Sequence, residues 1–153
     1  MKNVKFYGLP HERAVVEKGA EIGEGTRVGQ HSYIGKNAKI GRDCRILYHV
    51  TICKDAKIGD RVFIGPDTIF LNDKYPPTTV SLPPIVEDDV IIGGGVILGP
   101  DVIIGRKAVI GAGTTVTRDV PSETVIITEN KQKMIMTRQE YDEKQRMLKE
   151  KHK

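Results

Sequence analysis

Bulky apolar side chains recur at every sixth position along most of the chain. The series runs without a gap from Val16 to Phe70 and resumes out of phase from Val86 to Val116. A helix has a period of 3.6 residues and a simple strand a period of two, so neither explains a period of six. A coil of short strands does. The pattern therefore predicts an all-β solenoid before any other feature is considered. Its apolar positions are Val16, Ile22, Val28, Ile34, Ile40, Ile46, Ile52, Ile58, Ile64, Phe70, Val86, Ile92, Leu98, Ile104, Ile110 and Val116.

Two further positions accompany each apolar residue. The residue after it is usually glycine and the residue two before it is usually small, as in the unit Ala38-Lys39-Ile40-Gly41. Alternation along a strand places the small and the apolar side chains on the same inward face. We expect the glycine to supply the backbone freedom for a corner, so that three units close one triangular coil. Residues eighteen apart should then stack in columns, and each coil should bury the apolar ring of the next.

The repeat is interrupted once and ends before the chain does. The spacing from Phe70 to Val86 is sixteen residues where six are expected, an insertion of ten. Four prolines in the segment 71–84 stiffen it, so we expect a projecting loop where a ligand site can form. We expect a β-helix over residues 1–136, including this loop. A C-terminal helix and tail should follow over 137–153, opened by a capping box at Thr137 and Glu140.

Composition and charge narrow the class of protein. The chain has no long apolar run, which excludes a transmembrane helix, and its first residues lack the apolar segment of a signal peptide, which predicts a cytoplasmic protein. The formal net charge of +4 is spread over corners and tail. That distribution is typical of a solvated surface rather than a nucleic-acid site, and it suits an acidic ligand such as coenzyme A. Cys44 and Cys53 are half a coil out of column, so neither a disulfide nor a metal pair is expected.

Two kinds of motif resemble a known family. Units such as Ile34-Gly35-Lys36-Asn37-Ala38-Lys39 resemble the hexapeptide repeat of left-handed parallel β-helix proteins, over roughly residues 14–120. The segment Phe70-Leu71-Asn72-Asp73-Lys74-Tyr75-Pro76 resembles the Asn-Asp-x-x-Pro loop of hexapeptide N-acetyltransferases that act on nucleotide-linked amino sugars. Gly65-Pro66, Gly111-Ala112-Gly113-Thr114 and Asp119-Val120-Pro121 match as well. The left hand of the coil comes from this resemblance.

The resemblance implies an acetyl-CoA-dependent acetyltransferase acting on the amine of a nucleotide-linked amino sugar. It also implies a homotrimer with each active site between neighbouring chains, and no metal is expected. Such a site must hold the neutral amine against the thioester and stabilise the oxyanion. Asn72 would hold the sugar or the thioester, and Asp73 would orient the amine or take its proton. The plainer alternative is that both residues cap a turn before the prolines.

The resemblance also suggests contacts to both substrates. We expect Lys54, Lys74 and Tyr75 to contact the acceptor. Lys54 stands where the family often has a carboxylate, one coil before Asn72, and this departure indicates either a contact to a substrate phosphate or a different acceptor. The residues expected to bind coenzyme A are Gly94, Gly95, Ala112 and Gly113 along the pantetheine arm and Arg118, Lys131 and Lys133 at the phosphates. The same glycines are equally explained as corners. The family's closing Gly-Asn-Pro-Ala-Lys segment is Glu129-Asn130-Lys131-Gln132-Lys133 here, so only two of its residues match.

The histidines of the chain bear on alternatives to an N-acetyltransferase. His31 and His49 are eighteen apart and should stack in one column, with Arg13 before and Asp67 after. His49 is then either the base of a sugar or small-molecule O-acetyltransferase or part of an exposed corner ladder, which the pattern favours. A carbonic anhydrase of the γ class shares the solenoid but binds zinc with three histidines, and that set cannot be assembled here. A non-catalytic binding or scaffold protein is a further alternative, because the closing segment is altered.

Overall fold

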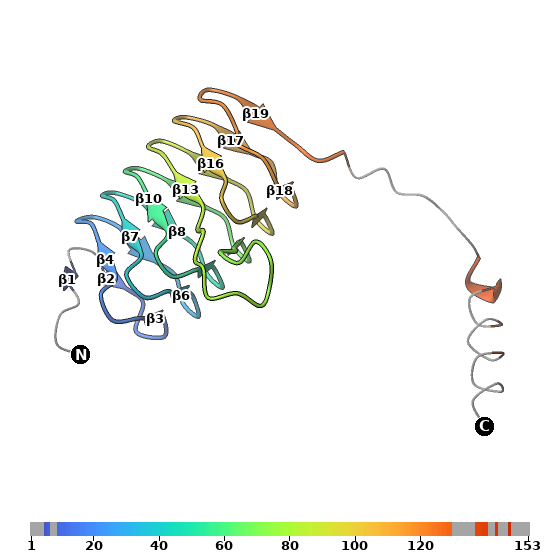
Figure 1. Ribbon diagram of the computed structural model, residues 1–153, viewed down its shortest axis with the longest axis horizontal. Helices are drawn as coiled ribbons and strands as arrows, with labels where there is room; N and C mark the ends of the chain where they lie inside the picture. Colours follow the sequence, from blue (N-terminus) through green and yellow to red (C-terminus); the bar gives the residue numbers. More distant parts are fainter. Residues whose placement is uncertain (1–4, 7–8, 130–136, 141–142, 144–146, 148–153) are drawn as a thin grey trace.

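The chain folds into a solenoid of short parallel strands. The computed structural model describes residues 5–6, 9–129, 137–140, 143 and 147, and the description below concerns these residues. Figure 1 shows the coils stacked along one axis, with the loop after β12 projecting from one side of the stack. The all-β solenoid predicted from the sixfold spacing is confirmed.

Each coil contributes one strand to each of three parallel sheets. Sheet A contains β1 (Lys5–Phe6), β4 (Glu21–Ile22), β7 (Lys39–Ile40), β10 (Lys57–Ile58), β13 (Ile85–Val86) and β16 (Ile103–Ile104). Sheet B contains β2 (Leu9–Pro10), β5 (Arg27–Val28), β8 (Arg45–Ile46), β11 (Phe63–Ile64), β14 (Ile91–Ile92), β17 (Val109–Ile110) and β19 (Val125–Ile126). Sheet C contains β3 (Val15–Val16), β6 (Tyr33–Ile34), β9 (Thr51–Ile52), β12 (Ile69–Phe70), β15 (Ile97–Leu98) and β18 (Thr115–Val116).

The turns between the strands form the three edges of the triangular stack. We name them by the sheets that they join. The AB edge contains residues 41–44, 59–62 and 87–90 and their equivalents in other coils. The BC edge contains residues 47–50, 65–68, 93–96 and 111–114, and the CA edge contains 53–56, the loop 71–84 and 99–102.

Strand register confirms both the coil length and the insertion. Lys39 pairs with Lys57, eighteen residues later. Lys57 pairs with Ile85, twenty-eight residues later, and Phe70 pairs with Leu98 at the same separation. The ten extra residues therefore leave the stack between β12 and β13 and return without disturbing the register.

The core is one ring of apolar side chains per coil. Ile22, Ile34, Ile52, Ile64 and Ile92 are fully buried, as the spacing predicts. The small inward positions hold alanine, valine, cysteine or a hydroxyl residue, and the hydroxyls of Thr26, Ser32 and Thr68 donate to carbonyls of neighbouring coils. Thr26 Oγ1 donates to the Gly41 carbonyl at 2.7 Å and accepts from the Cys44 N–H at 3.0 Å. Because a buried hydroxyl needs a partner, these bonds tie one coil to the next.

The role predicted for the glycine after each apolar residue is wrong. In the described chain the glycines with positive φ are Gly19, Gly25, Gly95 and Gly113, and none of them follows an apolar position of the repeat. The left-handed corner lies two residues later and is filled by those four glycines in some turns and by other residue types in the rest, such as His49 with φ 56°. The repeat glycine is needed because coils approach closely: a Cβ on Gly29 would lie 2.6 Å from the Leu47 carbonyl carbon.

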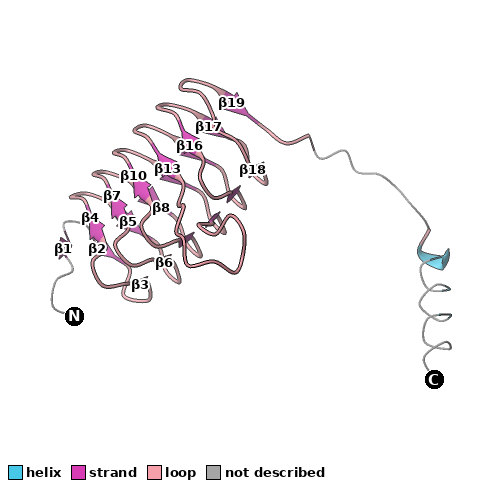
Figure 2. Cartoon of the chain, in the orientation of Figure 1, coloured by secondary structure: helices cyan, strands magenta, loops and turns pink. Residues whose placement is uncertain are grey.

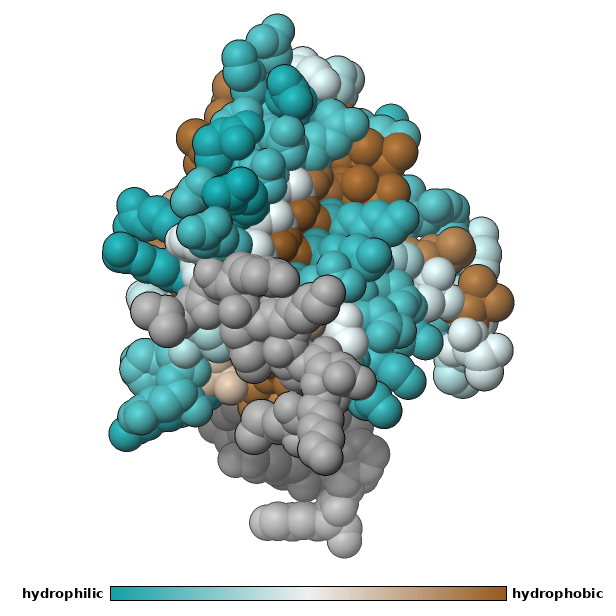
Figure 3. Space-filling view, turned by 90° about the vertical axis from the view of Figure 1, so that its left-hand side faces the viewer, coloured by the Kyte–Doolittle hydropathy of each residue, from teal (hydrophilic) through white to brown (hydrophobic). Residues whose placement is uncertain are grey.

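Outward-facing strand positions change character along the stack. Between residues 21 and 57 the outward positions of sheets A and B are charged, as at Lys39 on sheet A and Arg45 on sheet B. In the later coils they are apolar and exposed, as at Ile91, Ile103 and Val125. Figure 3 shows apolar patches breaking through a largely hydrophilic surface.

The described residues near the C-terminus are helical at 138–140, 143 and 147, and Figure 2 shows this turn as the part of the described chain drawn as helix. The predicted capping box is confirmed. The Glu140 carboxylate accepts from the Thr137 N–H at 2.6 Å, and the Glu140 N–H donates to Thr137 Oγ1 at 3.2 Å. Within the described chain, no helix is long and apolar enough to cross a bilayer. Residues 130–136 lie outside the described residues, and they include the predicted ligands Lys131 and Lys133. The predicted boundary between residues 136 and 137 lies at the end of this segment.

Candidate functional site

Asn72 closes the base of the projecting loop. Its carbonyl accepts from the Leu82 N–H at 2.8 Å, and its side-chain Nδ2 donates to Ser81 Oγ at 3.0 Å. The side chain is thus held in one orientation, half-buried at the start of the loop. Among the described residues its Oδ1 has no hydrogen-bond partner, so the amide keeps one acceptor for a ligand.

Asp73 organises the interior of the loop. Its carboxylate accepts from the Tyr75 N–H at 3.2 Å, the Thr78 N–H at 2.8 Å and Thr78 Oγ1 at 2.9 Å. The bond from the Thr78 N–H is the main cause that lowers the pKa of Asp73. A carboxylate stabilised in this way is a weaker base. The geometry therefore fits the turn-capping alternative for Asp73 better than proton transfer.

A second contact ties the loop to the next coil. Lys74 Nζ lies 3.0 Å from Asp101 Oδ2, and this contact raises the pKa of Lys74. Tyr75, at the tip, is 75% exposed. A groove of about 340 Å³ lies at the base of the loop, lined by Asp55, Lys57, Ser81, Leu82, Pro83, Ile85 and Asp101. Lys54 is exposed beside it, one coil before Asn72.

His49 stacks with its neighbours on the BC edge as predicted. Its ring centroid lies 5.4 Å from that of His31, and its Nδ1 lies 3.4 Å from Asp67 Oδ1. Both side chains of the His49–Asp67 pair are more than half exposed. The column is therefore an exposed ladder in a single chain, and its carboxylate faces the imidazole.

The residues predicted along the pantetheine arm form a strip on this same edge. Gly95 N–H donates to the Pro66 carbonyl at 2.8 Å, and Gly113 N–H donates to the Gly94 carbonyl at 2.9 Å. A Cβ built on Gly95 or Gly113 would meet nothing within 4 Å, so the strip is open on its outer side. Together with Ala112 it extends the column of His49 and Asp67 toward the later coils. We call Gly94, Gly95, Ala112 and Gly113 the glycine strip.

One chain does not bring all the predicted site residues together. Lys54, Asn72, Asp73, Lys74, Tyr75 and Arg118 lie at the CA edge, whereas His49 and the glycine strip lie at the BC edge. Sheet C separates the two groups, because His49 precedes β9 and Asn72 follows β12. A site that uses both groups needs a second copy of the chain.

The sequence prediction missed Ser81 and Asp101. Ser81 fixes the Asn72 amide and Asp101 anchors Lys74. Neither has a signal in the sixfold pattern, because the path of the inserted loop decides which residues it meets. The insertion length marks where such partners must lie, and it does not name them.

The described cysteines and carboxylates do not form a metal site. In the described part of the chain no group of three or more His, Cys, Asp or Glu side chains is placed to hold a metal ion. Cys44 and Cys53 are both free and buried. Burial raises the pKa of Cys53 to about 12, so its thiol stays protonated and unreactive.

Comparison with known proteins identifies the repeat. The model of the bacterial transferase hexapeptide, in six repeats, matches residues 37–72 and 83–118, the two stretches on either side of the loop. The chain carries this hexapeptide repeat in both stretches. A curated protein similar to it is the bifunctional protein GlmU of Herminiimonas arsenicoxydans, 34% identical over 119 residues, which cover 78% of this chain and 25% of GlmU. The chain therefore spans about a quarter of that relative.

Solved hexapeptide-repeat structures share the coil. PerB of Caulobacter crescentus, solved in complex with CoA and GDP-perosamine, is 25% identical with a TM-score of 0.65, over 78% of this chain and 53% of PerB. A variant of AntD, an N-acyltransferase of Bacillus cereus, was solved with dTDP-4-amino-4,6-dideoxyglucose and coenzyme A. It is 20% identical with a TM-score of 0.68, over 92% of this chain and 87% of AntD, a likeness of fold.

Proposed function

We propose that this protein transfers an acetyl group from acetyl-CoA to the amine of a nucleotide-linked amino sugar. The observation that carries the proposal is that PerB, a related coil, holds CoA and GDP-perosamine together. The chain described here supplies a matching pair of features. The glycine strip offers open backbone for an extended ligand, and the loop presents a fixed amide at Asn72.

The reaction needs a positioned amine more than a strong base. The amine nitrogen attacks the thioester carbon, the C–N bond forms, the C–S bond breaks, and the CoA thiolate takes up the proton that the nitrogen loses. Asn72 Oδ1 is available to accept a hydrogen bond from the amine and so aim its lone pair. Asp73 acts by shaping the loop, since its carboxylate is already occupied by three hydrogen bonds.

We propose a homotrimer in which the CA edge of one copy meets the BC edge of the next. The supporting observation is that the loop and the glycine strip stand at opposite ends of sheet C in one chain. A closed threefold ring joins two different edges in a head-to-tail contact and repeats the site three times. Exposed apolar positions of the later coils, such as Ile91 and Ile103, supply surface for the contact. Arg118, Lys131 and Lys133 would bind the phosphates of acetyl-CoA, and a cytoplasmic location follows from the use of this substrate.

The test follows release of the CoA thiol with a panel of nucleotide-linked amino sugars. We expect turnover with at least one of them, and about a tenfold or greater loss in Asn72→Ala, because one well-placed hydrogen bond in the transition state contributes that much. Thr79→Ala is the matched control, since it shortens an exposed residue of the same loop. No thiol release with any amino sugar, or equal rates in Asn72→Ala and wild type, would refute the proposal.

A second candidate rests on the His49–Asp67 pair, in which a carboxylate lies 3.4 Å from the imidazole. This arrangement suits a general base for an O-acetyltransferase acting on a sugar or another small molecule. Its prediction differs: His49→Ala would abolish transfer to a hydroxyl acceptor and leave transfer to an amine largely intact. Comparing the two acceptor classes with this variant separates the candidates.

A further inference from the structure

Two arginines stand side by side on the outward face of sheet B. Arg27 on β5 is the register partner of Arg45 on β8, so the two side chains leave neighbouring strands at the same height. Parallel strands are roughly 4.8 Å apart. A cavity of about 310 Å³ opens beside them, lined also by Gly29, Gln30, Leu47 and Tyr48. The pair therefore borders a space large enough for a small ligand.

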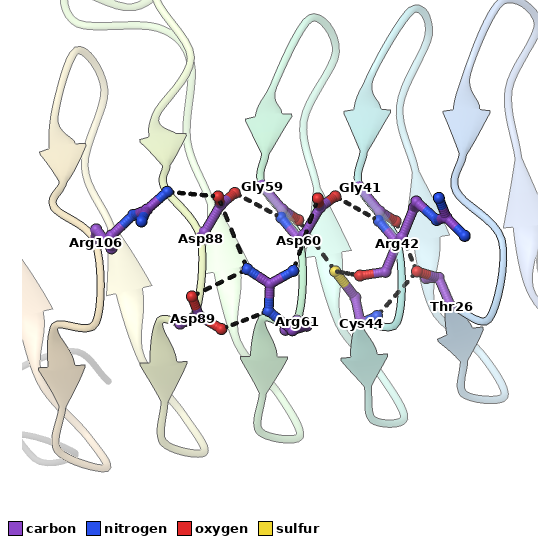
Figure 4. Close-up of polar contacts among 10 residues, drawn as sticks. All are labelled: Thr26, Gly41, Arg42, Cys44, Gly59, Asp60, Arg61, Asp88, Asp89 and Arg106. Carbon is purple, nitrogen blue, oxygen red and sulfur yellow. Dashed lines mark hydrogen bonds and ion pairs between the residues drawn. The ribbon is translucent and has the colours of Figure 1, made fainter.

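Neither arginine has a carboxylate partner among the described residues, which sets the pair apart from the arginines of the AB edge. There, Arg61 Nε lies 2.7 Å from Asp89 Oδ1, and Arg106 Nη2 lies 3.1 Å from Asp88 Oδ2 (Figure 4). Like charges directly opposite each other destabilise a sheet. A bound anion would remove this repulsion at Arg27 and Arg45.

Aromatic residues beside the two arginines can contribute to the binding of a nucleobase ring. The Arg45 Cζ atom lies 5.7 Å from the centroid of the Phe63 ring on β11, a cation–π contact that steadies the guanidinium. Tyr48, which also lines the cavity, is 47% exposed and carries an aromatic face that a nucleobase can stack upon. Two adjacent guanidinium groups match the oxygens of a diphosphate.

We infer that Arg27, Arg45 and Tyr48 bind the nucleoside diphosphate part of the acceptor. This inference rests on the proposed function, because it assigns that acceptor a second subsite. The position of this subsite is compatible with the proposed place of acetyl-CoA. Tyr48 adjoins His49 on the BC edge, and the glycine strip continues that edge toward the later coils. Acetyl-CoA on the strip and a nucleotide at the arginines would then meet from opposite ends of the stack.

The test is calorimetric titration with UDP, GDP and dTDP, each without acetyl-CoA. We expect one or more to bind, and the Arg27→Gln/Arg45→Gln variant to bind that nucleotide at least about tenfold more weakly. Lys36→Gln/Lys39→Gln is the control, because it removes two positive charges from other faces of the early coils. Tyr48→Ala should weaken binding of the nucleotide and leave the affinity for inorganic pyrophosphate unchanged. All four residues changed in the two double variants are exposed, so unchanged melting temperatures verify the fold.

The outcomes distinguish failure of this nucleotide site from failure of the proposed acetyltransferase function. Absence of nucleotide binding, or equal affinity in the arginine variant and its control, overturns the site. Loss of adenosine 3′,5′-bisphosphate binding in the arginine variant, with nucleoside diphosphate binding intact, assigns the pair to coenzyme A and overturns it too. Nucleotide binding that needs both arginines, in a protein that never releases the CoA thiol, supports the site and refutes the acetyltransferase. Thiol release by the wild type, with the same nucleotide affinity in the arginine variant, supports the acetyltransferase and refutes the site.

Discussion

At the scale of single residues, the sixfold pattern determines which side chains face inward. Ile34 and Ile64 are fully buried as predicted from spacing alone. The pattern does not reveal why glycine follows them, because the reason lies in the neighbouring coil rather than in the local backbone. Close approach at positions such as Gly29 and left-handed backbone at His49 are separate requirements, met two residues apart.

Substituting a repeat glycine tests this distinction. Gly29→Ala would place a Cβ 2.6 Å from the Leu47 carbonyl carbon, and we expect a loss of about 1–3 kcal/mol of stability from the forced shift. In Gly94→Ala the nearest atoms belong to Pro66 at 3.3 Å, so the loss should be clearly smaller. Chemical denaturation of both variants gives the comparison. Equal stability of the two would contradict the close-approach explanation.

The polar ladder of the AB edge shows how a pH dependence arises from one residue. The hydrogen bond from Arg61 is the main cause that lowers the pKa of Asp89. Because the folded-state value is depressed, Asp89 stabilises the fold fully above its unfolded pKa of about 3.9, and this contribution is lost as the pH falls through the folded value. Asp89→Asn should therefore melt below wild type at pH 7, and the gap should close below about pH 4. A gap for Asp89→Asn that persists in acid would contradict the assignment.

At the scale of elements, the sequence located the loop but not its internal structure. The shift in spacing between Phe70 and Val86 gave its place and length, and the register pairs confirm both. The bonds of Asn72 to Ser81 and of Lys74 to Asp101 depend on the path of the loop in space. No periodic signal encodes such a path. The candidate site was thus predicted by resemblance, and its supporting residues came only from the structure.

Asp73→Asn tests whether this residue shapes the loop or moves a proton. An amide cannot accept all three hydrogen bonds that the carboxylate now accepts, so we expect turnover to fall by about tenfold as the loop loosens. If Asp73 only organises the loop, the shape of the pH–rate profile should match that of wild type. Disappearance of one limb of that profile would instead identify Asp73 as a base.

At the scale of the whole molecule, the solenoid is one continuous stack whose predicted site residues lie on two edges. The BC edge holds His49, Asp67 and the glycine strip, and the CA edge holds the loop with Asn72. A single coil stack is too regular to fold one edge over the other. Assembly of several copies is therefore the step that creates the proposed site. This assembly was predicted only from the family resemblance.

Mixing two impaired variants tests this central claim most directly. Asn72→Ala removes the loop amide, and Ala112→Trp blocks the glycine strip at an exposed position. If each site joins the loop of one copy to the strip of the next, an equal mixture refolded together should regain about a quarter of wild-type activity, since random rings pair intact halves at that frequency. Each variant refolded alone is the control. A mixture no more active than the mean of the two variants would contradict a site shared between chains.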